Sequence, residues 1–338
     1  MDFTVKNIDT FDKLNWNNIL KDMEGPAHLC LWNSLDYYSA YPNIKNLSFV
    51  IINENKILGL VPLALNRSTQ KIKLEFANKI IFAPIFRKNI SSSLRKKIYK
   101  FIFDYLKEKF KKKLNICIQY SPIFFKNNMS FLSSKNQFEL IPYSYDYLIH
   151  NTLIQDLKIK TEDMLKNMSK YHRKNINRTS KMEELKFEVI SSHSKKELIR
   201  KKFNEFNKFH FISAGKATRP KKTWNIMLKK IFDDEADLFS LNFKNKSISY
   251  LYCAKYLDYA WGWSQVNLEK YEKISPRHFL EWKSMLYYKK KNFSFYEIGE
   301  RYEYQSKFKP TKKEISISEF KEKYGSDKYP KIEFRINY

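Results

Sequence analysis

Two stretches of this chain predict the same local structure, a β-hairpin with a short polar turn. The first is Ser48–Leu65, SFVIINENKILGLVPLAL, and the second is Leu238–Lys255, LFSLNFKNKSISYLYCAK. In each, two apolar runs flank a polar segment that contains an Asn-Lys pair, which is typical of a hairpin. The two pairs, at 55–56 and 245–246, stand 190 residues apart in equivalent places. We interpret the spacing as the trace of an internal repeat.

The elements that follow the two hairpins repeat as well. After the first hairpin we expect strands, a helix and a strand at 73–76, 79–82, 91–111 and 114–119. After the second we expect a strand, a helix and a strand at 259–264, 275–290 and 293–298. Ser275 is the expected N-cap of the last helix, and Pro276 its first residue. This order predicts two tandem α+β domains, at 1–150 and 151–338.

Composition places the chain among folded proteins. It has 338 residues, of which 43% are hydrophobic and 17% aromatic, enough for one large core or two smaller ones. No apolar run approaches the roughly 18 residues of a membrane span, and the N-terminus lacks the apolar core of a signal peptide. We therefore expect a cytoplasmic protein. Cys30, Cys117 and Cys253 lack paired spacing, which favours reduced core residues over disulfides or a metal site.

The charge leaves two interpretations open. Lys and Arg total 63 against 36 acidic residues, a net charge of +27, and only ten of the basic residues are Arg. The excess of Lys, Asn and Ile is typical of an AT-rich genome. It also suits an anionic partner such as RNA, a lipid head group or a phosphorylated precursor.

Several common enzyme signatures are absent from the sequence. Its six glycines are too far apart for a dinucleotide-binding loop or a P-loop. The patterns H-E-x-x-H, C-x-x-C and G-x-S-x-G do not occur either. Zinc hydrolases and α/β-hydrolases are therefore not indicated.

A basic segment separates the two repeats. We expect one helix over 161–181, with Thr161 as its N-cap and two acidic residues in its first turn. Basic residues recur on it at spacings of three and four: Lys166, Lys170, Arg173, Lys174, Arg178 and Lys181. This stripe is either a solvated face or one wall of a groove for an anionic substrate.

Six segments together resemble one enzyme family. They are ENKILGLVPLAL (54–65), KYHRKNINRTSK (170–181), FHFISAGKATRPKKTW (209–224), ISPRHFLEWKSM (274–285), FYEIG (295–299) and EFKEKYG (319–325). In this order, over about residues 30–326, they are similar to the FemAB-like branch of the GNAT acyltransferase superfamily, which includes peptidoglycan-bridge aminoacyltransferases. The resemblance implies two tandem GNAT-like domains, each a mixed, mostly antiparallel sheet flanked by helices. It also implies transfer of an aminoacyl or acyl group to an amine.

The resemblance assigns roles to particular residues. It implies that Lys321, positioned by Phe320 in the F-K-x-x-Y-G motif, stabilises the charge that develops on the acyl carbonyl or the leaving group. Arg219 and Thr218 match a substrate-binding stretch, and an Arg there can bind a carboxylate or phosphate in bidentate fashion. Further candidates bind substrate (Arg173, Lys174, Arg178, Tyr256) or a donor phosphate at a helix N-terminus (Ser275, Arg277).

The proton acceptor is not identified by sequence. Carboxylates near expected strand ends are Asp146, Glu297 and Glu300, and hydroxyl candidates are Tyr256, Tyr259 and Tyr302. Each can equally be a structural residue. Trp261 and Trp263 alternate along one strand, which favours core packing.

The donor and acceptor stay open at this level. The turn KYEKISPR (270–277) lacks the glycines with which coenzyme A-dependent GNAT enzymes hold a pyrophosphate, so the resemblance favours aminoacyl-tRNA over acyl-CoA as co-substrate. No permanently bound cofactor or metal is expected. The expected acceptor is an amine on a cell-envelope or exopolysaccharide precursor, with peripheral contact to an anionic membrane surface as a further possibility. The alternatives are an acetyl-CoA-dependent N-acetyltransferase acting on an amino sugar, and a non-catalytic protein that binds RNA or anionic surfaces.

Overall fold

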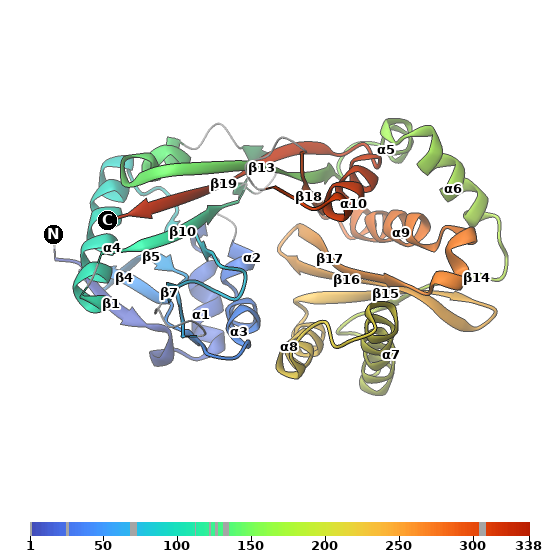
Figure 1. Ribbon diagram of the computed structural model, residues 1–338, viewed down its shortest axis with the longest axis horizontal. Helices are drawn as coiled ribbons and strands as arrows, with labels where there is room; N and C mark the ends of the chain where they lie inside the picture. Colours follow the sequence, from blue (N-terminus) through green and yellow to red (C-terminus); the bar gives the residue numbers. More distant parts are fainter. Residues whose placement is uncertain are drawn as a thin grey trace. The chain divides into compact units, whose positions relative to one another are not determined.

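The computed structural model describes residues 2–24, 27–67, 73–111, 113–121, 123–125, 128–130, 135–303 and 309–338. The chain forms two compact units (Figure 1). The first is Met1–Ile149 with Pro330–Tyr338, and the second is His150–Tyr329. The domain boundaries expected from sequence, 1–150 and 151–338, stay a prediction. The compact units differ from them in assigning the last nine residues to the first unit.

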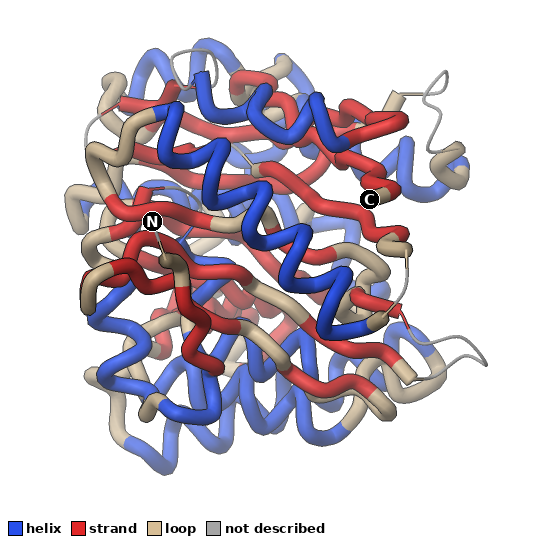
Figure 2. The backbone as a smooth tube through the Cα atoms, turned by 90° about the vertical axis from the view of Figure 1, so that its left-hand side faces the viewer, coloured by secondary structure: helices blue, strands red, loops and turns tan. Residues whose placement is uncertain are grey.

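The first unit mixes short strands with helices, which are drawn red and blue in Figure 2. Its helices are η1 (Ile8–Thr10), α1 (Lys13–Leu20), α2 (Ala27–Cys30), α3 (Trp32–Ser39), α4 (Ser92–Phe110) and η2 (Lys135–Tyr143). Its strands are β1 (Thr4–Asn7), β2 (Met23–Glu24), β3 (Ile44–Asn46), β4 (Phe49–Asn53), β5 (Lys56–Val61), β6 (Ala64–Asn66), β7 (Lys73–Leu74), β8 (Ile81–Phe82), β9 (Ile85–Arg87), β10 (Asn115–Tyr120), β11 (Ile123–Phe125) and β12 (Asn128–Ser130).

The sheets of the first unit are mostly antiparallel. One has the order β1-β4-β5-β9-β2, and β3-β6-β7 and β11-β12 form smaller sheets. Strand β10 pairs in parallel with β8 and antiparallel with the end of β19 (Asp327–Asn337). Helix α4 begins at the Ser91 cap, whose side chain accepts a hydrogen bond from the Leu94 amide. It buries Ile98, Ile102 and Phe103, which recur at helical spacing.

The second unit has fewer and longer elements. Its helices are α5 (Thr161–Asn167), α6 (Lys170–Ser180), α7 (Lys196–Ala214), α8 (Lys221–Phe232), η3 (Glu269–Ile274), α9 (Pro276–Lys290) and α10 (Lys312–Glu322). Its strands are the part of β13 (Ser144–Asp156) from His150 onward, β14 (Leu185–Ile190), β15 (Ala236–Phe243), β16 (Lys246–Tyr256), β17 (Tyr259–Asn267) and β18 (Phe295–Arg301). They follow the order β14-β15-β16-β17-β18-β13, and the β17–β18 pair is parallel.

Helices cover both faces of this sheet (Figure 1). On one face, Phe206 of α7 packs against Tyr252 of β16 and against Trp224 of α8. On the other face, α9 places Tyr288 against Phe239 of β15. Helix α9 is buried on most sides, and its apolar residues form the centre of the core of the unit.

The two predicted hairpins share their backbone geometry in detail. Strands β4 and β5 turn at Glu54 and Asn55, and β15 and β16 turn at Lys244 and Asn245. All four turn residues have positive φ, between 48° and 65°, the geometry of a two-residue turn that follows the twist of the strands. Each hairpin also has a register shift after the second pair from the turn, which leaves Leu58 and Ile248 as the extra residues. The bulge residues Leu58 and Ile248 are thus also 190 residues apart, like the two Asn-Lys pairs.

Neighbouring elements repeat around the hairpins. Each hairpin is preceded by an antiparallel strand, β1 or β14, that pairs with its first arm after helices have intervened in the chain. Each is followed by a helix, α4 or α9, and then by β10 or β18, each with a parallel partner. The expected α+β architecture, with mixed and mostly antiparallel sheets flanked by helices, is confirmed.

The basic segment forms two helices rather than the single helix predicted over 161–181. Helix α5 ends at Asn167 because Met168 is extended, with φ −68° and ψ 154°. Ser169 then caps α6 by accepting a hydrogen bond from the His172 amide, and its own amide donates to the Lys323 carbonyl. The residue before α5 is Lys160, so Thr161 is not the N-cap.

The Ser275 cap is also different from the prediction. Ser275 precedes Pro276 as expected, but it lies in the left-handed region, with φ 54°, and its side chain makes no capping bond. Its hydroxyl instead donates to Asn175 and accepts from Arg178, both on α6. Contacts from a distant helix therefore override the local capping preference.

The Gly of the F-K-x-x-Y-G motif is required by a close backbone approach. Gly325 has φ +76°, and a Cβ added there would lie 2.9 Å from the Asn167 Cβ and closer still to the Asn167 carbonyl group. The end of α10 thus rests against the α5–α6 junction. This contact explains why a small residue follows Tyr324, which is itself fully buried.

Replacing Gly325 by alanine is expected to destabilise the protein by more than about 2 kcal/mol, because a left-handed strain and a backbone clash add together. Gly215 is the matched control, since its φ is +67° but nothing lies within 4 Å of an added Cβ. Gly215→Ala is expected to cost only about 1 kcal/mol. The measurement is chemical unfolding of both variants, and equal losses of stability would contradict the close approach.

Candidate functional site

Two parallel strands separate in the middle of the second unit. Strands β17 and β18 pair in register only from Tyr259–Phe295 to Trp261–Glu297. Beyond these pairs, the registered partners of β17 lie in β16 and those of β18 lie in β13. A β-bulge follows on each strand, with Trp263 and Ile298 as the extra residues. Bulges are common next to active sites, where they redirect side chains.

A glycine stands on each strand just past the point of separation. An added Cβ on Gly262 of β17 would lie 3.0 Å from the Tyr296 hydroxyl and 3.3 Å from Glu281 Oε1. An added Cβ on Gly299 of β18 would clash with the Lys321 ammonium, and the φ of Gly299 is +123°, a region open essentially to glycine alone. The two bare backbone positions therefore bring a carboxyl group and an ammonium group against the parting strands.

Glu281 is a buried carboxyl group with one strong partner. It projects from α9 and is 5% exposed. The Tyr296 hydroxyl donates a hydrogen bond to it over 2.8 Å. Burial raises the pKa of Glu281 to about 7, although the Tyr296 bond and the charges of Lys321 and Arg277 act in the opposite direction. A carboxyl group that titrates near neutral pH is suited to accept a proton from a reacting amine.

Lys321 lies in the last turn of α10, half-buried, with its side chain against Gly299. Phe320 beside it packs into an aromatic cluster. Its ring centroid is 4.9 Å from those of His172 and His278 and 5.8 Å from that of Tyr324. These contacts anchor α10 to α6 and α9, and so fix the place from which the Lys321 side chain begins.

The two histidines of this cluster are neutral structural groups. Their ring centroids are 4.5 Å apart, and His172 is fully buried. Burial lowers the pKa of each to about 4, and their mutual proximity lowers that of His172 further. Two neutral rings can share an apolar pocket, whereas two imidazolium ions cannot.

The carboxylates predicted as proton acceptors occupy other environments. Glu297 is buried and accepts hydrogen bonds from the hydroxyls of Thr152 and Tyr259. Glu300 lies 3.6 Å from His150 and accepts a bond from the Tyr302 hydroxyl. Asp146 belongs to the first unit, where its carboxylate is 3.5 Å from Arg335.

Two arginines of the predicted basic stripe make structural bonds. Arg173 donates to the carbonyls of Leu165, Lys166 and Met168 at the end of α5, where the last carbonyls of a helix lack their regular helical partners. Arg178 donates to the Lys273 carbonyl and the Ser275 hydroxyl, and so ties α6 to the start of α9. Lys174 is exposed. Substrate binding by Arg173, Lys174 and Arg178 stays a prediction.

The predicted donor-phosphate residues lie at the start of α9. The Ser275 side chain is buried and bonded to α6, so its hydroxyl is not presented to solvent. Arg277 is half-exposed, with its guanidinium 5.5 Å from the Phe320 ring centroid and 3.7 Å from a Glu272 oxygen. The role of both residues in binding phosphate stays a prediction.

Arg219 lies on the opposite face of the sheet, over β17. Its guanidinium stacks 4.9 Å from the Trp224 ring and donates to the Ser264 hydroxyl over 3.0 Å. His210 contacts the same hydroxyl at 3.1 Å.

Trp261 and Trp263 form a stacked, half-buried pair on β17, with ring centroids 5.3 Å apart. Thr218 is exposed in the α7–α8 loop, and Tyr256 ends β16.

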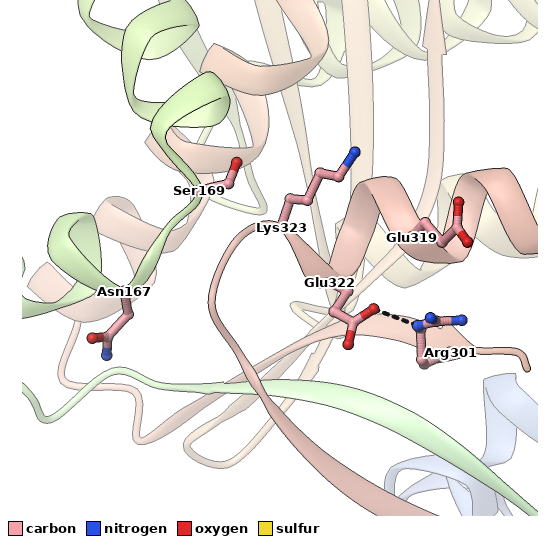
Figure 3. A pocket seen from close by; sticks show the side chains of 6 residues that line it. All are labelled: Asn167, Ser169, Arg301, Glu319, Glu322 and Lys323. Carbon is pink, nitrogen blue, oxygen red and sulfur yellow. Dashed lines mark hydrogen bonds and ion pairs between the residues drawn. The ribbon is translucent and has the colours of Figure 1, made fainter.

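A separate pocket of about 430 Å³ lies on the other face of α10 (Figure 3). Its lining residues are Asn167, Ser169, Arg301, Glu319, Glu322 and Lys323. Arg301 is bonded to Glu322 over 2.6 Å. Helical spacing puts Glu319, Glu322 and Lys323 on one face of α10 and Phe320, Lys321 and Tyr324 on the other. Neither Lys321 nor Glu281 lines this pocket, so we do not take it as the reaction site.

Glu281 is the residue that sequence reasoning missed. One signal was available, because Glu281 falls on the face of α9 that also carries His278, Met285 and Tyr288, all buried. A charged residue at such a position marks either a paired structural charge or a functional group. Sequence gave no indication that Tyr296 and Lys321 would flank it.

No group of three or more His, Cys, Asp or Glu residues in the described part of the chain is arranged to hold a metal ion. None of the described helices is long and apolar enough to cross a membrane.

Comparison with known proteins gives similarity of structure without similarity of sequence. No family model matches the chain, and no curated protein matches it. The crystal structure of FemX is similar over 99% of this chain and 98% of that one, with a TM-score of 0.68 and 12% identity. The C-terminal domain (DUF2156) of a putative lysylphosphatidylglycerol synthetase from Agrobacterium fabrum is similar over 96% and 92%, with a TM-score of 0.61 and 10% identity.

A tandem GNAT protein from the clavulanic acid biosynthesis pathway is similar over 99% of this chain and 98% of its own, with a TM-score of 0.54 and 9% identity. At such identities the likeness concerns the fold. The resemblance inferred from sequence motifs is thereby confirmed at that level: the chain has the fold of FemX and of a tandem GNAT protein.

Proposed function

We propose that the protein is an N-acyltransferase that moves an aminoacyl or acyl group from an activated donor to an amine of a cell-envelope or exopolysaccharide precursor. The observation that carries the proposal is the placement of Glu281 against Gly262 and of Lys321 against Gly299, where β17 and β18 part, with the Lys321 charge acting on the Glu281 pKa. One group suits proton acceptance and the other suits stabilisation of negative charge. Acyl transfer to an amine needs both.

The proposed reaction has a simple balance of bonds and protons. The amine nitrogen attacks the acyl carbon, forms the amide bond and gives its proton to the Glu281 carboxylate. The Lys321 ammonium stabilises the negative charge that develops on the carbonyl oxygen or the leaving group. The ester or thioester bond of the donor then breaks, and the leaving group takes up the proton that Glu281 accepted, which returns the carboxylate to its starting state.

Glycine at 262 and 299 supports this assignment. The absence of a side chain at both positions leaves room that Glu281 and Lys321 occupy, so the two charged groups lie directly against the backbone where the strands part. Gly299 is also needed for its own backbone angle, which any other residue would strain.

The proposal names aminoacyl-tRNA as the donor and acyl-CoA as the alternative. The turn before α9 has no glycine, and Ser275, which could have offered a hydroxyl to a phosphate, uses it to hold α6. The net charge of +27 suits a polyanionic donor. The names of the similar structures support the envelope acceptor: one is a putative lysylphosphatidylglycerol synthetase. The name of the tandem GNAT structure, which refers to AcCoA, supports the alternative.

The test is transfer of a radiolabelled acyl group by the purified full chain. Charged tRNA and acetyl-CoA are offered separately, each with an amine-bearing cell-wall precursor and with an amino sugar. We expect label from tRNA to appear on the precursor, and to be lost when its amine is blocked beforehand. Binding of tRNA should also fall steeply as salt rises.

Two outcomes would change the conclusion. Micromolar binding of acetyl-CoA, with tRNA binding that disappears near physiological salt, would make this an acetyl-CoA-dependent enzyme. Binding of tRNA without transfer to any amine would favour a non-catalytic RNA-binding protein.

A further inference from the structure

The corner between α7 and α8 combines positive charge with exposed apolar side chains. We define the α7–α8 corner as Lys208–Lys222. No acidic residue occurs between Glu205 and Asp233, so the charged residues of this segment are all basic. Its basic residues are Lys208, Lys216, Arg219, Lys221 and Lys222. All four lysines are exposed.

Two large apolar side chains project from this corner. Phe211 is 57% exposed and Ile212 is 65% exposed, both in the last turn of α7. Every residue from 211 to 218 is exposed. A single exposed apolar residue is ordinary on a protein surface. Two adjacent exposed apolar residues in a segment with four exposed lysines indicate a binding surface.

The exposure of these side chains is built into the fold. Phe209 and His210, just before them, face inward: the Phe209 ring lies 5.2 Å from Tyr250 and the His210 ring 5.4 Å from Trp224. Because α7 is anchored through that face, Phe211 and Ile212 must point to solvent. Gly215 then ends the helix in the left-handed region with open space around it.

We propose that the α7–α8 corner docks the protein onto the surface of an anionic lipid bilayer. Phe211 and Ile212 enter the boundary between head groups and acyl chains, and Lys208, Lys216, Lys221 and Lys222 contact anionic head groups. A small apolar insertion and a polybasic patch are each weak, and together they give reversible peripheral binding. This docking goes beyond the proposed reaction and does not depend on it.

The pair of side chains favours a bilayer over a nucleic acid. Single-stranded RNA is bound by basic grooves with aromatic rings on which bases stack. Phe211 has such a ring, but Ile212 has neither a charge nor a π face, and it is the more exposed of the two. In a bilayer, burial of both the Phe211 and the Ile212 side chains favours binding.

The experiment is co-sedimentation of the full chain with vesicles, using phosphatidylcholine alone and phosphatidylcholine mixed with phosphatidylglycerol. We expect binding to the anionic vesicles that weakens as salt rises, and little binding to the neutral ones. Phe211→Ser with Ile212→Ser should lower the partition coefficient about tenfold. Lys221→Gln with Lys222→Gln should lower it about tenfold at low salt.

Matched controls separate this surface from general charge and stickiness. Lys312→Gln with Lys313→Gln removes two exposed lysines from the same first two positions of another helix, α10. Leu14→Ser with Leu257→Ser removes two apolar side chains that are 71% and 72% exposed elsewhere. Both control pairs should bind anionic vesicles like the unchanged protein, and all variants should keep its melting temperature.

Four results would overturn the proposal. Equal binding to neutral and anionic vesicles would show that this corner does not recognise anionic lipid. An equal loss of vesicle binding in the control pairs would show that this corner has no specific part in binding. Loss of tRNA binding in Lys221→Gln with Lys222→Gln, with vesicle binding intact, would assign the surface to nucleic acid. A change of oligomeric state in Phe211→Ser with Ile212→Ser, without any change in vesicle binding, would assign it to a protein contact.

Discussion

Replacing Lys321 by alanine is expected to lower the turnover number about 100-fold or more while the protein stays folded. A donor aimed at a developing oxyanion contributes about 2.7–4 kcal/mol to the transition state, and its loss appears mainly in turnover. Lys321 is placed for this role, with its ammonium against Gly299 and its charge acting on Glu281. The measurement is steady-state acyl transfer with thermal melting as the test of folding.

Lys323→Ala is the matched control for this experiment. Lys323 stands two residues later, exposed and on the other face of α10, where it lines the separate pocket. It should keep near-normal turnover. Near-normal turnover in a stable Lys321→Ala protein would instead show that Lys321 has no part in the reaction.

Gly299→Ala approaches the same question from the strand side. An added Cβ would displace the Lys321 ammonium and strain a backbone at φ +123°. Turnover should fall even though Lys321 is present. A variant that melts normally and reacts normally would show that the contact between Gly299 and Lys321 has no part in the reaction.

Replacing Glu281 by glutamine is expected to lower kcat/KM at pH 8 by about 100-fold or more, the usual contribution of a general base. In the unchanged protein, kcat/KM should rise with pH and level off above an apparent pKa near 7, because only the ionised carboxyl group accepts a proton. Glu281→Gln should lose this rise. Persistence of the same pH dependence in Glu281→Gln would assign it to another group.

Folding stability gives a second readout for Glu281 that does not depend on activity. The pKa of Glu281 rises from an ordinary value of 4.5 to about 7 on folding, so the folded state binds the proton more tightly than the unfolded one. The contribution of Glu281 to the free energy of unfolding should therefore become progressively less favourable as pH rises from about 4.5 to 7, and should stay constant above pH 7. Glu281→Gln should remove this component.

Glu297→Gln is the matched control, since Glu297 is a buried carboxylate on β18 held by two hydroxyl donors. We expect it to alter stability and to leave the dependence of kcat/KM on pH near 7 in place. If Glu297→Gln abolished that dependence while Glu281→Gln kept it, the roles of the two carboxylates would be reversed.

Much of the architecture was predictable because it is local. The hairpin turns at Asn55 and Asn245 follow from residues that tolerate positive φ between two apolar runs. The helix beginning at Ser91 carries its own cap. The order of elements repeats along the chain, so the α+β fold of tandem GNAT type could be expected from that order and the family motifs.

Predictions failed where a distant contact outweighed a local preference. Ser275 precedes a proline and has the side chain of an N-cap, yet Asn175 and Arg178 of another helix take its hydroxyl. The regular spacing of basic residues over 161–181 suggested one helix, but Ser169 bonds to Lys323, more than 150 positions later, and the helix breaks there. Spacing along a helix does not show which charges cap a neighbour, as Arg173 does for α5.

The sequence by itself determined the turns and the helices and strands that follow them, and it predicted a role for the F-K-x-x-Y-G motif. Only the tertiary structure decided what those residues face. Gly262, Glu281, Gly299 and Lys321 come from four different elements, and they meet because β17 and β18 pair over three residues and then part. The pKa of Glu281 depends on that burial. Desolvation and side-chain proximity are set by packing between segments far apart in the chain, which local residue patterns do not encode.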